Sequence, residues 1–319
     1  VDAIREGLEW LGLDHDEGPF FQSRRLDLYA ERTRQLIEGG HAYYCYCSVE
    51  ELEAKRASAE AAGHRPVYDR KCRDLGRRPQ AGEKPVIRLR CPLSGETAID
   101  DMVRGYVLFD NGELDDLILV RSDGSPTFHL TVVVDDIEMN ITHVLRGEDH
   151  LTNTPRQIQI YRGLGAKPPR FGHLSLIVGT DRARLSTRHG ATAVSAYRDL
   201  GFLPEAVVNY LARLGWSHGD QEIFTREQLV AAFDVAAVNR AAAAFDMEKF
   251  AWVNAQHMKM ADDAALVAAL APHLASAGEP EWPVEYLCRV VGLLRERART
   301  LVEMAAQAHV FVSDDIRYD

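Results

Sequence analysis

Apolar residues follow two different spacings along this chain. Between residues 23 and 38 they recur every three or four positions, as on one face of an α-helix, and Gly39-Gly40 favours the end of that helix. Short apolar runs, typical of β-strands, separate such segments as far as residue 179. After Gly190 almost every segment has the helical spacing. The pattern therefore predicts mixed α/β structure followed by an all-helical part.

The order of the predicted elements indicates the fold class. Strands are predicted at residues 42–47, 86–90, 106–109, 117–120, 132–134, 141–145 and 173–179. Helices are predicted at residues 1–13, 23–38, 48–62, 152–164, 195–200, 204–214, 225–233, 246–254, 262–275 and 282–307. The runs at 132–134, 141–145 and 173–179 are apolar enough for parallel strands that are buried on both faces. This order favours an α/β fold, in which a Rossmann-like parallel sheet carries an insertion and is followed by a helical domain.

Two polar segments come directly after apolar runs and are candidates for anion binding. The first reads Arg184-Leu185-Ser186-Thr187-Arg188-His189-Gly190, and the second reads Arg146-Gly147-Glu148-Asp149-His150. Guanidinium groups bind phosphate and carboxylate oxygens through paired N–H donors, and hydroxyl groups add further donors. A solvated surface loop would fit the first segment as well. Arg146 could instead form a structural salt bridge with Asp149 or Asp136.

Length, charge and cysteine content narrow the class of protein. The chain has 319 residues and a net charge of −11, which suits two or three domains and argues against non-specific nucleic-acid binding by the whole surface. Nine Lys and Arg residues between Arg65 and Arg90 could still contact RNA phosphates, or they could form a solvated loop. No apolar run reaches the roughly 20 residues of a membrane span, and no signal peptide is recognisable. We therefore expect a cytoplasmic protein without membrane contact.

Three of the five cysteines, Cys45, Cys47 and Cys72, form a candidate metal site. In a cytosolic protein a Cys-x-Cys pair favours a metal over disulfides, and Zn²⁺ takes four ligands, often thiolates. The alternative is three buried free thiols. Cys91 and Cys288 are expected to lie in the core.

Together these segments resemble the class I glutamyl-tRNA synthetases, in which residues 184–190 would correspond to the KMSKS signature. The resemblance extends over nearly the whole chain in the family's order, which makes it specific although no single motif would be. The matching segments are CYCS at 45–48, FDNGELDDLILVRSDGSPT at 109–127, VVVDD at 132–136, THVLRGEDHLTNTPRQ at 142–157, LSTRHGA at 185–191, GFLPEAVVNYLARLGWS at 201–217 and FDMEKFAWVN at 245–254.

The resemblance implies ATP-dependent ligation of L-glutamate to tRNA(Glu) through a glutamyl-adenylate, with ATP, Mg²⁺ and in some members a structural Zn²⁺. It also implies a monomer and five parts. These are the tail of the first nucleotide-fold half at 1–40, an insertion that binds the tRNA acceptor end at 41–124, the second nucleotide-fold half at 125–190, a stem-contacting helical domain at 191–255 and the start of a helical anticodon-binding domain at 256–319.

No HIGH-like tetrapeptide, the family's other signature, occurs in this sequence. We therefore expect an internal fragment that lacks the N-terminal HIGH-bearing half and the C-terminal end, with only part of the parallel sheet. Such a fragment is expected to be inactive on its own.

The resemblance also implies roles for individual residues. Arg184, Ser186, Thr187 and Arg188 would act on the phosphates, Leu176 and Ile177 together with Thr187 would contact ATP, and Arg146 and Phe128 would bind glutamate. Glu148 and His150 match further letters of the family's motif.

Two positions depart from the family pattern. Thr187 stands where the family has its second lysine, and losing one such contact typically costs about a hundredfold in rate. Phe128 stands where many relatives have a tyrosine, so a hydroxyl donor to the substrate is missing.

The fourth metal ligand is left open by the resemblance. Some relatives have histidine where this chain has Asp74, and the paralogue that glutamylates queuosine uses a tyrosine at the position of Tyr68. Asp74 is slightly favoured, because a carboxylate is already ionised at neutral pH.

The queuosine paralogue, glutamyl-queuosine tRNA(Asp) synthetase, is one alternative function, although it stops before the helical anticodon domain. A non-catalytic tRNA-binding remnant is the other.

Overall fold

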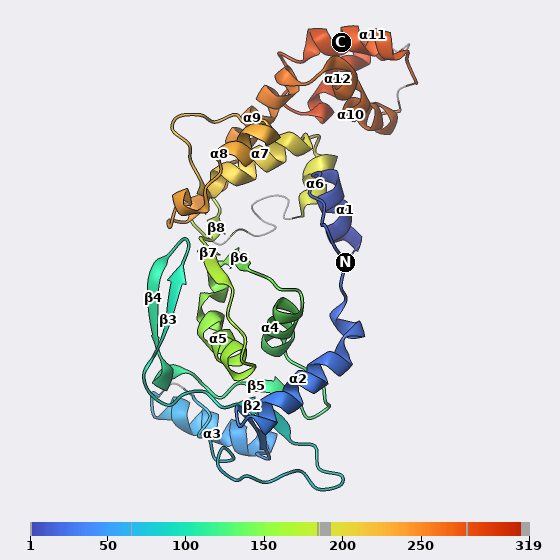
Figure 1. Ribbon diagram of the computed structural model, residues 1–319. Helices are drawn as coiled ribbons and strands as arrows, with labels where there is room; N and C mark the ends of the chain where they lie inside the picture. The colour runs from blue at the N-terminus through green and yellow to red at the C-terminus, as the bar shows by residue number, and fades with distance from the viewer. Residues whose placement is uncertain (1, 65, 184, 186–192, 279, 314–319) are drawn as a thin grey trace. The chain divides into compact units, whose positions relative to one another are not determined.

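A computed structural model describes residues 2–64, 66–183, 185, 193–278 and 280–313 (Figure 1). The chain divides into two compact units, one formed by residues 19–174 and the other by residues 1–18 together with 175–319. Each unit has hydrophobic clusters of its own. The expected order of mixed α/β structure followed by helices is confirmed.

Among its described residues, the unit formed by residues 19–174 contains three small sheets and four α-helices. A three-stranded antiparallel sheet has the order β1-β2-β5, a hairpin joins β3 and β4, and β6 pairs with β7 in parallel. The strands are β1 (Ala42–Cys45), β2 (Val86–Leu89), β3 (Glu96–Asp101), β4 (Gly105–Asp110), β5 (Ile118–Val120), β6 (His143–Gly147) and β7 (Arg170–Leu174). The helices are α2 (Leu26–Glu38), α3 (Val49–Ala61), α4 (Phe128–Glu138) and α5 (Thr154–Gly163).

The strand predicted at residues 132–134 is wrong, because these residues lie inside helix α4. Leu130, Val133, Val134 and Ile137 have the spacing of one helical face, which the three valines conceal when they are read alone. Leu130, Val133 and Val134 are fully buried. Burial in the core of this unit, which includes residues of α2 and α5, therefore overrides the β-propensity of valine.

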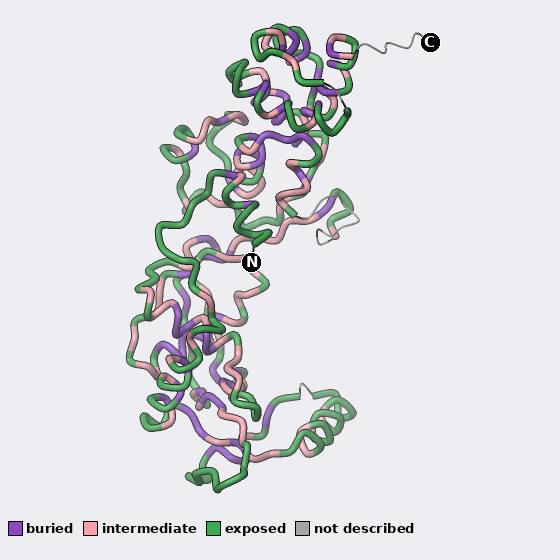
Figure 2. The backbone as a smooth tube through the Cα atoms, turned by 90° about the vertical axis from the view of Figure 1, so that its right-hand side faces the viewer, coloured by how far each residue is buried: buried purple, intermediate pink, exposed green. Residues whose placement is uncertain are grey.

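Two further predictions about the parallel strands need correction. The run at 173–179 is not one strand, because β7 ends at Leu174. The next strand, β8 (Ile177–Val178), already belongs to the second unit, where it pairs in parallel with β9 (Ala243–Ala244) of the same unit. Strand β6 is not buried on both faces, since Leu145 is 50% exposed. In contrast, α3 exposes most of its surface and has no buried residue, as Figure 2 shows.

The second unit is helical apart from β8 and β9 among its described residues. Its helices are α1 (Asp2–Trp10), α6 (Val194–Asp199), α7 (Pro204–Gly215), α8 (Arg226–Ala232), α9 (Met247–Met260), α10 (Asp263–Ser276), α11 (Val284–Leu294) and α12 (Leu301–Val312). The single helix predicted at 282–307 is wrong. It breaks before Thr300, whose side chain accepts a hydrogen bond from the Glu303 N–H and so starts a new helix.

Gly201 permits a close approach between the loop before α7 and the start of α12. Its φ is 81°, and a Cβ atom there would lie 2.5 Å from the Val302 nitrogen. The Leu301 N–H donates to the Gly201 carbonyl at 2.8 Å. No helix in the described ranges is long and apolar enough to cross a membrane.

Candidate functional site

Arg146 lies near the end of β6, and its guanidinium group is held by neutral partners. Its Nε donates to His173 Nε2 at 3.2 Å, and its Nη2 donates to Thr154 Oγ1 and Gln157 Oε1, each at 2.7 Å. Thr154 and Gln157 lie on α5, and His173 lies on the neighbouring strand β7. The parallel pairing of β6 with β7 places Arg146 beside His173 in register.

One side of this guanidinium remains available. Nη1 has no hydrogen-bond partner in the part of the chain that the structure describes, and no carboxylate there lies within 4.0 Å of Arg146. The Asp136 carboxylate instead accepts from the Tyr161 hydroxyl at 2.7 Å. Burial lowers the pKa of Arg146, with Asp136 partly opposing the shift. The salt bridge to Asp149 or Asp136 that the sequence left open is therefore absent among the described residues, and Nη1 can receive an anion.

The other residues proposed near glutamate take different positions. Phe128 is the first residue of α4, is 50% exposed, and has its ring centroid 6.0 Å from that of His150. The Asn153 side-chain nitrogen lies 3.0 Å from His150 Nδ1. Glu148 forms a salt bridge with Arg104. Phe128 can provide a wall, whereas the Glu148 carboxylate already has a cationic partner.

The three candidate metal-binding cysteines come together at the end of β1 and in the segment before β2. Their sulfur atoms all lie within 4.8 Å of one another, and the Sγ atoms of Cys47 and Cys72 are 3.7 Å apart. Tetrahedral Zn²⁺ with sulfur at roughly 2.3 Å requires sulfur atoms about 3.8 Å apart. The three thiols therefore fit a zinc ion.

The geometry distinguishes between the two candidates for the fourth ligand. The Tyr68 hydroxyl lies 3.2 Å from Cys45 Sγ and 3.6 Å from Cys47 Sγ, distances that suit a shared metal. The Asp74 carboxylate is 83% exposed and pairs with Arg90 at 2.8 Å. We therefore infer that Tyr68, rather than the slightly favoured Asp74, completes the set.

Burial and hydrogen bonds set the protonation of this cluster. Burial would raise the pKa of Cys45, but hydrogen bonds involving Tyr68, the Cys47 backbone and Arg88 lower it overall. Burial raises the pKa of Cys47 to about 12 and also raises that of Tyr68. Zinc binding would therefore have to displace protons from buried groups. Cys91 is fully buried and Cys288 partly buried, as expected.

Asp116 anchors the segment that carries Cys72. Its carboxylate is fully buried and accepts from Arg73 Nη1 at 2.7 and 2.8 Å, from the Tyr43 hydroxyl at 2.7 Å and from the Cys91 N–H at 3.0 Å. Arg88, also buried, donates to the Asp116 carbonyl. Arg73 and Arg88 of the basic cluster between residues 65 and 90 are therefore used inside the protein. Salt bridges to carboxylates also engage Arg70, Lys71, Arg77 and Arg90. Arg78 and Lys84 have no such partners among the described residues.

The candidate phosphate loop lies largely outside the described residues. These exclude Arg184, Ser186, Thr187 and Arg188. Of the two residues expected at ATP, Ile177 accepts at its carbonyl from the Leu185 N–H at 3.2 Å and packs against the helical core, and Leu176 precedes β8. The loop is preceded by a tight turn in which the Gly179 N–H donates to the Ala183 carbonyl.

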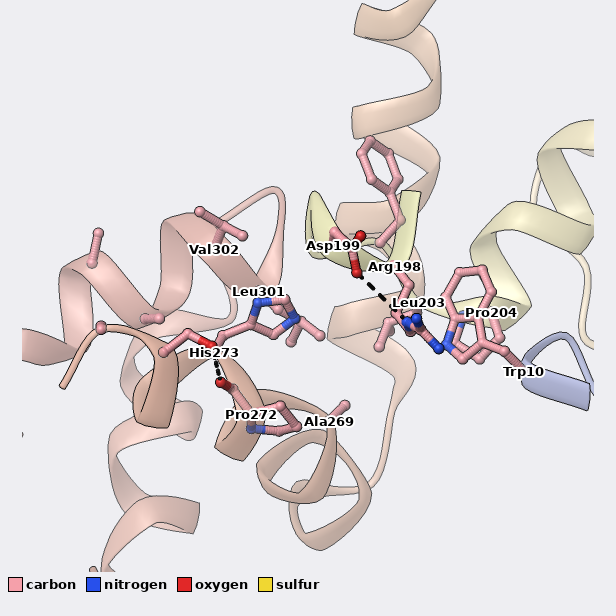
Figure 3. A pocket seen from close by; sticks show the side chains of 15 residues that line it. Trp10, Arg198, Asp199, Leu203, Pro204, Ala269, Pro272, His273, Leu301 and Val302 are labelled. Carbon is pink, nitrogen blue, oxygen red and sulfur yellow. Dashed lines mark hydrogen bonds and ion pairs between the residues drawn. The ribbon is translucent and has the colours of Figure 1, made fainter. Parts of the chain in front are cut away.

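A cavity of about 770 Å³ in the helical unit lies away from all of these side chains. Trp10, Leu203 and Pro204 line one side, and Pro272, His273 and Leu301 line the other (Figure 3). Its charged residues are mostly neutralised, since Arg198 pairs with Asp199 at 3.6 Å and with Glu6 at 2.8 Å. The residues that line this apolar cavity do not include those that the sequence motifs predict to bind phosphate or carboxylate groups. The candidate reaction site is therefore the one around Arg146.

Comparison with known families decides the classification. The profile of the class I tRNA synthetase (E and Q) catalytic domain matches residues 1–252. The chain belongs to this family. The profile of an anticodon binding domain matches residues 265–319, over the helices α10, α11 and α12.

Relatives within this family are similar over nearly the whole chain. Glutamate–tRNA ligase of Syntrophobacter fumaroxidans is 52% identical over 319 residues, which are 100% of this chain and 68% of the relative. Glutamate–tRNA ligase of Nitrosomonas europaea is 53% identical over 312 residues, with 98% and 67% covered. The crystal structure of a glutamate tRNA ligase from Elizabethkingia meningosepticum in complex with its amino acid superposes with a TM-score of 0.87 at 32% identity, covering 99% of this chain and 70% of that one.

These findings confirm the family expected from the motifs and disfavour the glutamyl-queuosine paralogue. The expected helical anticodon part is matched by a family profile, and the named relatives are glutamate–tRNA ligases.

Three residues around Arg146 escaped the sequence interpretation, namely His173, Thr154 and Gln157. His173 lies in an apolar run that predicts only a strand, and Thr154 and Gln157 lie near the start of a predicted helix. These residues could have been identified as candidates from their positions, because His173 lies near the end of the strand β7 and Thr154 and Gln157 lie near the start of the helix α5, the two elements that flank Arg146.

Proposed function

We propose that this chain belongs to an enzyme that catalyses ATP-dependent ligation of L-glutamate to tRNA(Glu) through a glutamyl-adenylate. The observation that carries the proposal is the half-buried Arg146 guanidinium, whose described partners are neutral and whose Nη1 is open. A bound glutamate side-chain carboxylate would supply the missing negative charge. The names of the relatives that cover the whole chain support the same substrate.

In this mechanism the α-carboxylate of glutamate attacks the α-phosphate of ATP, which forms the glutamyl-adenylate and releases pyrophosphate. Such a reaction needs positioning and neutralisation of developing charge more than covalent help from the protein. Arg146 would hold the glutamate side chain, and Phe128 would provide one wall. Arg184, Ser186, Thr187 and Arg188 would contact phosphate oxygens, with Mg²⁺ as the family's usual counterion. Leu176 and Ile177 would present backbone groups to adenine.

Zinc would have a structural role at a distance from the reacting atoms. The ion would be held by Cys45, Cys47, Cys72 and Tyr68. It would thereby join the end of β1 to the segment between α3 and β2, which carries Tyr68 and Cys72. The boundaries proposed for the parts remain 41–124 for the acceptor-binding insertion, 125–190 for the second nucleotide-fold half and 191–255 for the stem-contacting domain.

The test is aminoacylation by the product of the complete gene. Glutamate, glutamine and aspartate are compared as substrates, and tRNA(Glu) is compared with tRNA(Asp). We expect glutamate transfer to tRNA(Glu) alone. Transfer to tRNA(Asp) would favour the queuosine paralogue, and tRNA binding without any transfer would favour a non-catalytic remnant.

A further inference from the structure

A second carboxylate, Asp101 at the end of β3, is connected to Arg146 through one histidine. Asp101 Oδ2 lies 2.5 Å from His173 Nδ1, and both side chains are completely buried. The opposite nitrogen of the same ring, His173 Nε2, accepts the hydrogen bond from Arg146 Nε at 3.2 Å. All three residues belong to the unit formed by residues 19–174.

We propose that Asp101 and His173 are positioning residues that fix the plane of the Arg146 guanidinium group toward the substrate carboxylate. This inference rests on the proposed function, because it concerns how Arg146 meets glutamate. Neither residue touches the substrate.

The hydrogen bonds on the two ring nitrogens determine the tautomer of His173. Arg146 Nε can only donate, so His173 Nε2 has to be the acceptor and carries no proton. The Asp101 carboxylate can only accept, so His173 Nδ1 has to carry the proton. The ring is therefore neutral with its proton on Nδ1. Burial lowers the pKa of His173 overall, although the hydrogen bond to Asp101 and its charge oppose the shift, and the lowered pKa agrees with a neutral ring.

Only this tautomer orients Arg146. A proton on Nε2 would face the N–H of Arg146 Nε and turn an attraction into a repulsion. Thr154 Oγ1 also lies 3.0 Å from His173 Nε2 and accepts from Arg146 Nη2 at 2.7 Å, so a misplaced ring would disturb two contacts of the guanidinium. With Nε and Nη2 fixed in this way, Nη1 is the nitrogen that remains for the substrate.

Asp101 is itself held rigidly by the turn between β3 and β4. Its Oδ1 accepts from the N–H groups of Val103 at 3.0 Å, Arg104 at 2.8 Å and His173 at 3.1 Å. The Met102 N–H donates to the Phe171 carbonyl at 2.8 Å and so joins the turn to β7. In Figure 1 the β3–β4 hairpin runs beside β7. The turn thus transmits a fixed geometry from the predicted insertion to the glutamate-binding arginine.

The decisive substitution is Asp101→Asn in the product of the complete gene. The asparagine Oδ1 can keep the three backbone bonds, but its NH₂ group then points at His173 Nδ1 and forces the proton onto Nε2. We expect kcat/KM for glutamate to fall roughly 10- to 100-fold, mainly through KM, while KM for ATP stays unchanged. The matched control is Asp100→Asn, which removes the same charge from the exposed neighbouring position of β3 and should leave both constants unaltered.

A measurement on the unmodified protein keeps the inference falsifiable even if the variant does not fold. With ¹⁵N-labelled histidine, the nitrogen shifts of His173 should report a proton on Nδ1, and the signal is assigned by its loss in His173→Gln. A proton on Nε2, or on both nitrogens at pH 7.5, would overturn the inference. So would an unchanged KM for glutamate in a folded Asp101→Asn protein. If the unmodified protein activates no glutamate, the proposed function fails, whereas the tautomer result still stands.

Discussion

The protein has two polar clusters in the same unit that are assembled in different ways. One is the cysteine cluster, and the other, called here the arginine cluster, consists of Arg146 and the residues that hold it, Asp101, Thr154, Gln157 and His173. The cysteine cluster takes its groups from Cys45, Cys47, Tyr68 and Cys72, which lie within 28 residues of sequence. The arginine cluster joins residues from β3, β6, α5 and β7, and Asp101 alone is 72 residues from His173. The first can be recognised as a motif, whereas the second exists only once the chain has folded.

Each cluster also depends on one buried carboxylate, and the two carboxylates are neutralised differently. Asp116 is compensated directly by the Arg73 cation and ties down the cysteine segment. Asp101 faces a neutral histidine and is compensated by N–H groups, which together with the histidine lower its pKa although burial opposes this. One carboxylate therefore stabilises a charge pair, and the other sets a tautomer.

Asp116→Asn should give the largest effect on stability. It leaves Arg73 buried without its anion, which typically costs roughly 3–5 kcal/mol in the free energy of unfolding. Denaturant unfolding measures the loss, and Asp100→Asn, exposed and unpaired with any cation among the described residues, is the control. Because Asp116 supports the cysteine cluster, the zinc content should fall as well. The His173 tautomer in the remaining folded protein should be unchanged, because Asp101 sets it. A loss below about 1 kcal/mol would show that the pair is dispensable.

Arg146→Ala should give the next largest effect. It should lower the activity with glutamate and leave the zinc content unchanged. An unpaired, desolvated substrate carboxylate costs roughly 2–5 kcal/mol, which is a roughly 30- to 4,000-fold fall in kcat/KM for glutamate. Glutamate-dependent ATP–pyrophosphate exchange by the product of the complete gene measures it, with ATP binding followed separately. Arg34→Ala, on the exposed face of α2, is the control. An unchanged kcat/KM would refute the role given to Arg146.

Tyr68→Phe sharpens the comparison from the side of the metal. The protein purified without chelator should hold about one zinc per chain, and less than about a tenth of an equivalent would contradict the site. Removing the Tyr68 hydroxyl should weaken zinc binding by at least the roughly 10- to 100-fold typical of lost outer-shell partners. Asp74→Asn is the matched variant and should bind zinc normally. The opposite ranking in a chelator competition assay would restore Asp74 as the ligand.

The family and the fold class predicted from the sequence are confirmed, and Arg146 and the three cysteines could be named from the sequence as candidates, but the groups that support Arg146 could not be predicted. Strand β3 was missed because its buried positions include Thr97 and Asp101, so the usual apolar alternation is hidden. The apolar run around His173 correctly places this residue in a strand, but it does not reveal that the His173 ring contacts Asp101 on one side and Arg146 on the other. In α4 the short valine run suggested a strand, and only the longer helical spacing reveals the helix. Buried polar residues and short runs are therefore where sequence patterns are least informative.

The smallest expected effect is a loss of stability in mild acid that depends on His173. Burial holds its folded-state pKa below the ordinary value of 6.5, with a smaller contribution from Arg146, although Asp101 opposes the shift. Below about pH 6.5 the unfolded chain therefore binds a proton that the folded chain does not, so protons favour unfolding. The contribution is fully present above the unfolded-state pKa and is lost as the pH falls through the folded-state pKa. Thermal unfolding between pH 7.5 and 5 should show a steeper decline for the unmodified protein than for His173→Gln, which cannot take up this proton. Parallel declines would mean that His173 has the same pKa in the folded and the unfolded protein, and a shallower decline for the unmodified protein would mean that the folded-state pKa is raised; either result would contradict the lowered pKa on which this prediction rests.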